Sequence, residues 1–390
     1  MISSPAFLMP KDQLISWRFL TFLAATDLCP DTAQTRRYFF FFARNAIYHS
    51  LRALNISQGA RVLVPSYICA AAVEPMVAYG AHVDFYQVGR DCQPDFSDIE
   101  ARICGETQAI MAVHYFGFPQ KIREFRELCD RSGLALIEDC AHVLRTEVDG
   151  QRLGTFGDIS VHSWRKFFPI YDGGELVLNR SKLDFKMDWS DESWLLTLKV
   201  ARNMFDQICF QPEHPILKTI SGCVQYGQEI WNIARGAEQS AIRSVHNNSA
   251  SFSGSLVSQP ISRLSRWTLR HSDVPAVVES RRKNYLYLHR ELGSLDGISL
   301  LFPNLPPGVC PWIFPLFFDE ITDAHLALRQ RGVPAVTWQG VRQPGICKTV
   351  YPDADFLYDN LVFLPVHQSL SEKALGAVVE SVKAVRRTNR

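Results

Sequence analysis

Short apolar runs alternate with amphipathic stretches along the first half of the chain. The strands that this pattern predicts span residues 61–65, 82–86, 109–113, 134–138 and 159–162, and helices at 70–79 and 121–131 lie between them. Strands that alternate with helices of this length are typical of a mainly parallel, doubly wound α/β sheet. Ligands of such sheets bind beyond the carboxyl ends of the strands, so the residues just after Val113, Ile137 and Val161 deserve the closest inspection for chemistry.

The rest of the chain follows a different pattern. After residue 181, apolar side chains recur at helical spacing and predict helices, and a polar stretch at 246–254 predicts a loop. The last predicted elements are a long helix from about residue 275, a strand at 312–318, a helix at 324–330 and a helix from Ser371. We therefore predict a large domain over residues 1–270, with a helical and loop insertion at about 181–260, and a smaller α+β domain over 271–390.

Composition and charge narrow the classes of function. Lys and Arg total 41 against 40 acidic residues, so no overall field attracts nucleic acid or an anionic membrane, and we expect neither as a partner. The ten cysteines include no Cys-x-x-Cys pair and no zinc-type spacing, so we expect no metal site and interpret them as free thiols of a cytoplasmic protein. The apolar run at 14–25 is interrupted by Arg18 and is too short to cross a bilayer; it predicts a buried helix.

Two residues combine reactive chemistry with a place at the predicted ligand edge. Asp139 follows the strand at 134–138, and Lys166 follows the strand at 159–162. A pyridoxal-phosphate (PLP) site needs both residue types: an amine that holds the cofactor as a Schiff base, and a carboxylate that keeps the pyridine nitrogen protonated. Arg165 would lower the pKa of the lysine if it points inward. By itself, the pair also fits a helix-capping aspartate and a solvated lysine.

Seven motifs surround this pair in a fixed order. They are PSY (65–67), YGA (79–81), VHYFG (113–117), IEDCAH (137–142), LGTFGDI (153–159), SWRK (163–166) and DGGELV (172–177). The series resembles the DegT/DnrJ/EryC1/StrS family of PLP-dependent sugar aminotransferases, continuously over about 44–180 and again at LPVH (364–367). The resemblance implies the aspartate-aminotransferase fold (PLP fold type I), with a mainly parallel large domain and a smaller C-terminal α+β domain.

The resemblance also implies roles for individual residues. Lys166 matches the Schiff-base lysine, which also shuttles the proton between substrate carbon and cofactor carbon, and Asp139 matches the partner of the pyridinium nitrogen. His142 stands where the family has Gln or His near the ring hydroxyl of the cofactor. Ser163 matches a hydroxyl that holds the phosphate. A packed histidine and a buried strand serine remain the alternatives for these last two positions.

Three departures from the family pattern concern the phosphate, the cofactor ring and the substrate. Where the family opens its first helix with Ser-Gly-Thr, this chain has Arg44 and Asn45, which can still donate to phosphate at a helix N-terminus; a plain cap by Asn45 is the alternative. Cys69 stands where many members stack an aromatic ring on the cofactor, and Tyr67 is close to it in sequence. The substrate-pocket segment Gly-Tyr-Asn-Tyr-Arg has no counterpart here, which leaves Asn247 and Asn248 as distant candidates for its role.

The activity implied by the resemblance is amino transfer from an amino-acid donor, through the pyridoxamine form of the cofactor, to a keto sugar expected to be nucleotide-linked. A homodimer is implied as well, because sites of the family are built at the subunit interface. Two alternatives stay open: a sugar dehydratase on the same fold, against which Lys166 argues because that subgroup has histidine there, and a non-catalytic PLP-binding or regulatory relative. An unrelated nucleotide-binding protein is disfavoured, since no glycine-rich fingerprint follows an early strand.

Overall fold

A seven-stranded sheet with strand order β1-β9-β8-β5-β4-β2-β3 forms the centre of the computed structural model. The structure describes residues 35–180, 182–209 and 252–388, together with residues 9, 13, 14, 16, 19 and 20. Five neighbouring strands are parallel: β2 (Arg61–Pro65), β3 (His82–Tyr86), β4 (Thr107–Val113), β5 (Ala135–Cys140) and β8 (Ile159–Ser163). At one edge, β9 (Gly174–Leu178) runs antiparallel to both β8 and β1 (Arg36–Phe40). The predicted mainly parallel α/β sheet is confirmed.

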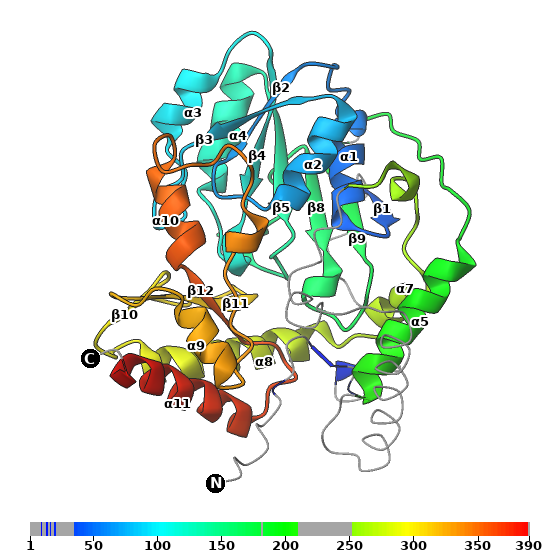
Figure 1. Ribbon diagram of the computed structural model, residues 1–390. Coiled ribbons are helices and arrows are strands. Elements are labelled where there is room, and N and C mark those ends of the chain that lie inside the picture. Colours follow the sequence, from blue (N-terminus) through cyan, green and yellow to red (C-terminus); the bar gives the residue numbers. More distant parts are fainter. Residues whose placement is uncertain are drawn as a thin grey trace, which may run out of the picture.

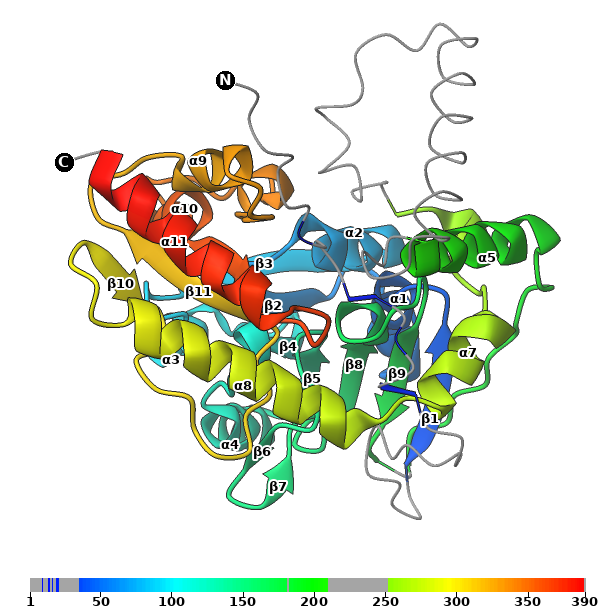
Figure 2. The same cartoon turned by 90° about the horizontal axis from the view of Figure 1, so that it is seen from below.

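Helices cover both faces of this sheet (Figures 1 and 2). The first face carries α1 (Ala43–Ala53) and α2 (Ala70–Tyr79), and the second carries α3 (Phe96–Arg102) and α4 (Ile122–Ser132). The strands between them are apolar along their length; in β2, the consecutive residues Val62, Leu63 and Val64 are all fully buried. Successive side chains point to opposite faces of a strand, so such a run needs cover on both faces.

A second, three-stranded sheet lies beyond the carboxyl ends of the parallel strands, with order β10-β11-β12. Its strands are β10 (Ile298–Leu300), β11 (Ile313–Phe318) and β12 (Val362–Pro365), all antiparallel to their neighbours. Three further helices belong to this half of the molecule: α8 (Val274–Leu292), which packs against β11 and α11, α9 (Ala324–Gln330) and α11 (Glu372–Thr388) (Figure 2). These elements confirm the helices and the strand predicted for this region, whereas α10 (Pro352–Asn360), β10 and β12 were not predicted. The domain boundary at residue 270 stays a prediction.

The predicted insertion and the start of the chain are described in part. One helix, α5 (Trp194–Cys209), confirms the helical interpretation of the insertion, but Asn247 and Asn248 lie outside the described residues. A further helix, α7 (Arg263–Arg270), follows the insertion. The helix predicted at 14–25 also lies largely outside them; of its described residues, Leu20 forms an isolated β-bridge with Ser272.

Two sequence expectations concern cysteines and membrane spans. The seven cysteines whose side chains are described are all free thiols. Within the described parts of the chain, no helix combines the length and apolar composition that a membrane crossing requires.

Gly117 provides a stability test of the turn that follows β4. Its φ is +98°, and a Cβ there would lie 2.1 Å from the carbonyl oxygen of Cys310, on the approach to β11. We expect Gly117→Ala to lower the free energy of unfolding by about 3 kcal/mol or more, because left-handed strain and a backbone clash add. Gly133 is the matched control: its φ is +67° but a Cβ meets nothing within 4 Å, so Gly133→Ala should cost about 1 kcal/mol. Equal losses in denaturant unfolding would show that the contact with Cys310 is unimportant.

Candidate active site

Three neighbouring parallel strands deliver polar residues to one edge of the large sheet. In β5, Asp139 pairs with Val113 of β4 on one side and with Val161 of β8 on the other. Strand β8 ends at Ser163, and the short 3-10 helix Trp164–Lys166 follows directly. Because all three strands end at the same edge, Asp139 and Lys166 meet there although 27 positions separate them in sequence.

Lys166 is half-buried, and its amine lies against an aromatic ring. Its Nζ is 4.8 Å from the ring centroid of Trp312, which comes from the segment leading into β11. Burial lowers the pKa of Lys166 to about 8, the negative charges of Asp139 and Cys69 raise it, and the neighbouring Arg165 lowers it further. The amine is therefore far more often neutral near pH 8 than an ordinary lysine, which makes it a usable nucleophile.

Asp139 is a buried carboxyl group, 7% exposed, at the end of β5. Its Oδ1 accepts a hydrogen bond of 2.8 Å from the backbone N–H of Ala141. Burial raises the pKa of Asp139, while the positive charge of Lys166 and the hydrogen bond from Ala141 lower it. A carboxylate in these surroundings is suited to hold a nearby cation or a protonated ring nitrogen.

His142 lies in a stack of aromatic rings. Its ring is parallel to that of Trp312, with centroids 4.1 Å apart, and its Nδ1 accepts a hydrogen bond of 3.3 Å from the backbone N–H of Phe116. Burial, and then the charge of Lys166, hold the pKa of His142 well below its ordinary value, so the ring is neutral and carries its proton on Nε2.

Trp312 is the residue of this site that the sequence did not single out. Its only signal was its place at the start of a predicted strand, and no motif connected it with the lysine. Its ring contacts both the imidazole of His142 and the amine of Lys166, so the segment leading into the small sheet contributes to the site.

The N-terminus of α1 contributes positive charge. Phe42 occupies the N-cap position and gives the helix no side-chain cap, while Arg44 stands in its first turn. Burial lowers the pKa of Arg44, and the charges of Glu74, Cys69 and Tyr171 raise it. Asn45 does not cap the helix, which was the alternative considered for it; its side-chain amide donates to the carbonyl of Leu256. The roles of Arg44 and Asn45 toward a phosphate stay predictions.

The remaining predicted residues lie at different depths. Cys69 is half-buried at the N-cap of α2, and burial raises the pKa of its thiol while the positive charge of Lys166 lowers it. Ser163 is buried at the end of β8 and pairs with Gly174. Tyr67 is fully buried in an aromatic cluster, 4.8 Å from the ring of Trp338. Roles for these three residues toward a cofactor stay predictions.

A buried carboxylate next to Asp139 was also missed. Glu138 points to the opposite face of β5, where Oε1 accepts from the backbone N–H of Gly157 (2.5 Å) and Oε2 from that of Gly154 (2.8 Å). His114 Nε2 lies 3.1 Å from Oε2, and its Nδ1 accepts from the backbone N–H of Gln120, so Nε2 is the donor.

This network explains the LGTFGDI motif, because the carboxylate of Glu138 ties its two glycines to β5. His114 and Glu138 also approach Cys140, with ligand-type atoms within 4.8 Å of one another. The hydrogen bonds that the imidazole and both carboxylate oxygens make give this cluster a structural role.

Comparison with known proteins gives this site a context. Residues 43–192 match the model of the DegT/DnrJ/EryC1/StrS aminotransferase family. GDP-perosamine synthase of Vibrio cholerae is 39% identical over 137 residues, which make up 34% of this chain and 37% of that protein. UDP-N-acetyl-3-dehydro-alpha-D-glucosamine 3-aminotransferase of Acidithiobacillus ferrooxidans is 35% identical over 150 residues, 37% of this chain and 40% of that protein. The matched stretch thus spans well under half the length of these curated relatives.

The likeness in three dimensions extends further along the chain. The crystal structure of the aminotransferase TlmJ from Streptoalloteichus hindustanus has a TM-score of 0.63 and 21% sequence identity, and the comparison covers 90% of this chain and 86% of that one. Similarity at this level of identity concerns the fold, and it confirms the expected aspartate-aminotransferase-like architecture. Over residues 43–192 the chain is therefore similar to the DegT/DnrJ/EryC1/StrS aminotransferase family, and over most of its length it shares the fold of an aminotransferase of known structure.

Proposed function

We propose that this protein is a PLP-dependent aminotransferase that moves an amino group from an amino-acid donor to a keto sugar, in nucleotide-linked form, or to a related carbonyl compound. The observation that carries the proposal is the meeting of Lys166, an amine of pKa about 8, with the buried carboxyl of Asp139 at one sheet edge. The substrate class rests on the names of the relatives, which are enzymes of sugar nucleotides.

Three features of the described residues fit PLP. The amine of Lys166 is partly shielded from water, and Asp139 lies at the end of a neighbouring strand. The uncapped N-terminus of α1, with Arg44 in its first turn, suits a phosphate group, because helix N–H groups and the helix dipole favour an anion. The stacked ring of His142 places a neutral imidazole in the same site.

The division of work among these residues follows from their chemistry. When bound, PLP supplies an electrophilic carbon and a ring that accepts electrons released at the substrate carbon. Nζ of Lys166 would hold the cofactor and could afterwards carry a proton at the reacting carbon. The carboxylate of Asp139 would favour a protonated ring nitrogen, and Nε2–H of His142 would be a donor for the ring hydroxyl. Arg44 would neutralise phosphate charge.

The proposal extends to assembly and setting. By analogy with the family, we propose a homodimer that works in the cytoplasm on two small molecules, an amino donor and a carbonyl acceptor. The sugar-dehydratase alternative is less well supported because Lys166 is present where that subgroup has histidine. A non-catalytic PLP-binding relative is the remaining alternative, and it differs from the enzyme in one measurable property, conversion by an amino donor.

The test is the visible absorbance of the purified protein mixed with PLP. We expect a new band, and we expect borohydride to fix the cofactor on the peptide that contains Lys166. A panel of amino acids, glutamate first, should then include one that removes the band and releases the matching keto acid. Absence of the band contradicts the proposal, whereas a band that no donor converts supports the non-catalytic alternative.

The lowered pKa of Lys166 predicts how cofactor capture depends on pH. Only the neutral amine attacks an aldehyde, so the capture rate should rise about tenfold per pH unit below pH 8 and level off above about 8. An ordinary lysine, with a pKa of 10.5, would keep gaining rate up to that pH. Stopped-flow absorbance between about pH 6 and pH 10 distinguishes the two profiles.

A further inference from the structure

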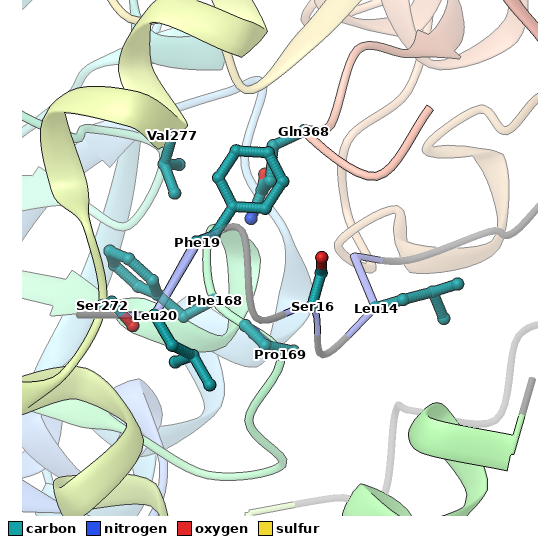
Figure 3. A pocket seen from close by; sticks show the side chains of 9 residues that line it. All are labelled: Leu14, Ser16, Phe19, Leu20, Phe168, Pro169, Ser272, Val277 and Gln368. Carbon is teal, nitrogen blue, oxygen red and sulfur yellow. The ribbon is translucent and has the colours of Figure 1, made fainter. Parts of the chain in front are cut away.

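Four successive carbonyl groups of the loop that carries Lys166 accept hydrogen bonds from side chains remote in sequence. Nε2 of Gln13 donates to the carbonyls of Arg165 (2.6 Å) and Phe168 (2.7 Å). Nε2 of Gln368 donates to the carbonyl of Phe167, at 2.8 Å. Figure 3 shows a small cavity next to this loop, which Phe168 and Gln368 border together with Phe19, Pro169 and Val277. Segments near both ends of the chain therefore bind the backbone of this loop.

The fourth carbonyl, that of Lys166 itself, is bound by Arg281 of α8. The guanidinium of Arg281 donates to three acceptors: the carbonyl of Lys166 (3.2 Å), the carbonyl of Trp312 (3.0 Å) and Oε1 of Gln368 (3.0 Å). The Cζ atom of this guanidinium also lies 4.9 Å from the ring centroid of Phe167. A single side chain thus joins the lysine loop, the start of β11 and the segment after β12.

Arg281 is an unusual residue to find at this position. It is 1% exposed, and burial lowers its pKa to about 10. Among the described residues, no carboxylate lies within ion-pair distance of it, so its charge is compensated by the three oxygen acceptors and the ring of Phe167. Burial of a guanidinium without a counter-ion is costly, and a neutral side chain could fill the same space at lower cost.

The three acceptors of Arg281 indicate the role of its buried guanidinium. Lys166 and Trp312 are the two partners of the amine–indole contact of 4.8 Å, and Arg281 binds the backbone of both. The planar fork of a guanidinium holds two acceptors at a fixed separation, which a lysine or an amide cannot do. The distance between the lysine loop and the small sheet is thereby set at the site.

We propose that Arg281 is a positioning residue for Lys166: it holds the lysine loop and Trp312 in register so that the amine stays against the indole and away from water. The proposal rests on the proposed function for its purpose, because a lysine kept in place serves a PLP site. Its physical content, the placement of one amine, is measurable without a cofactor.

The test measures the pH dependence of Lys166 acetylation in the cofactor-free protein, by mass spectrometry of its peptide. Without the hydrogen bonds from Arg281, the amine of Lys166 should reach water, and burial should no longer lower its pKa. Arg281→Met should therefore move the midpoint of the acetylation profile upward by about one pH unit or more. Arg281→Lys keeps the charge without the fork and should give an intermediate shift. The matched control is Arg282→Met: Arg282 is the next residue of α8 and donates to the carbonyls of Pro306 and Val309, not to the lysine loop. Its profile should coincide with that of the wild type.

The outcomes separate this inference from the proposed function. If wild-type protein forms no lysine-dependent band with PLP while Arg281→Met shifts the acetylation midpoint, the positioning role stands and the cofactor assignment fails. If the band forms but folded Arg281→Met has the wild-type midpoint, the positioning role is wrong. Should Arg281→Met fail to fold, Arg281→Lys decides alone: a midpoint equal to that of the wild type overturns the proposal, and an upward shift supports it.

Discussion

Lys166→Ala is expected to abolish both the visible band formed with PLP and the amino-transfer reaction. No other amine occupies the position against Trp312 in the described part of the chain, so attachment and proton transfer are lost together. The loss of turnover should be about 10⁴-fold, the upper end of what a positioned proton-transfer group supplies. The measurement is donor-driven conversion of the cofactor, followed by absorbance, in wild type and variant.

Two variants sharpen this result. Lys166→Arg keeps the positive charge but not a neutral amine, so it should fail as completely as alanine if the role is chemical. Lys121→Ala removes an exposed lysine at the N-cap of α4 and should leave the band unchanged. Retention of activity in Lys166→Ala would refute the role assigned to this residue.

Glu138→Ala is expected to produce the largest loss of stability of the substitutions considered. The variant leaves the N–H groups of Gly154 and Gly157 and the Nε2–H of His114 without their acceptor in a buried region. Removal of one member of a buried charged network costs about 3–5 kcal/mol, so the denaturant midpoint should fall markedly. The loop at 153–159 should also lose protection from hydrogen exchange ahead of the rest of the sheet.

The control for this experiment is a carboxylate from the same region that faces solvent. Glu147 lies in the hairpin strand β6 (Glu147–Val148), where its side chain is 44% exposed and pairs with Arg152 at 3.4 Å. An exposed pair of this kind contributes about 0–1 kcal/mol, so Glu147→Ala should have little effect. Similar midpoints for the two variants would show that the hydrogen bonds of Glu138 contribute little.

Two departures from the family pattern, at Asn45 and at Cys69, can be described in terms of the contacts that these residues make. Asn45 has its amide committed to Leu256, so the favourable field at this helix start comes from the backbone and from Arg44. Cys69 lies close enough to Lys166 for their charges to influence each other, which puts it at the site although it offers no aromatic ring. Both departures thus lie close to the sheet edge that carries Asp139 and Lys166.

Local patterns in the sequence were sufficient for the large sheet and for the two residues that define its chemistry. Apolar runs predicted β2, β3, β4, β5 and β8, because a strand buried on both faces is apolar along its length. Amphipathic periods predicted α2 and α4, whereas α3 was not predicted. Asp139 and Lys166 could be placed at one edge because parallel strands end together, and the ordered motifs added the resemblance to a known family. The edge strand β1 escaped prediction, since its antiparallel pairing with β9 depends on residues about 140 positions away.

Only the tertiary structure revealed what surrounds and supports the reactive amine. Trp312 contacts Lys166 from a remote part of the chain. The hydrogen bonds to the carbonyls of the lysine loop come from Gln13, Arg281 and Gln368, which lie 115 to 201 positions from their acceptors. A single side chain that binds a backbone carbonyl across such a distance leaves no period and no spacing in the sequence. The sequence therefore determined where the chemistry lies along the chain, and packing between remote segments determined how the amine is held, because that depends on distances that exist only after the chain has folded.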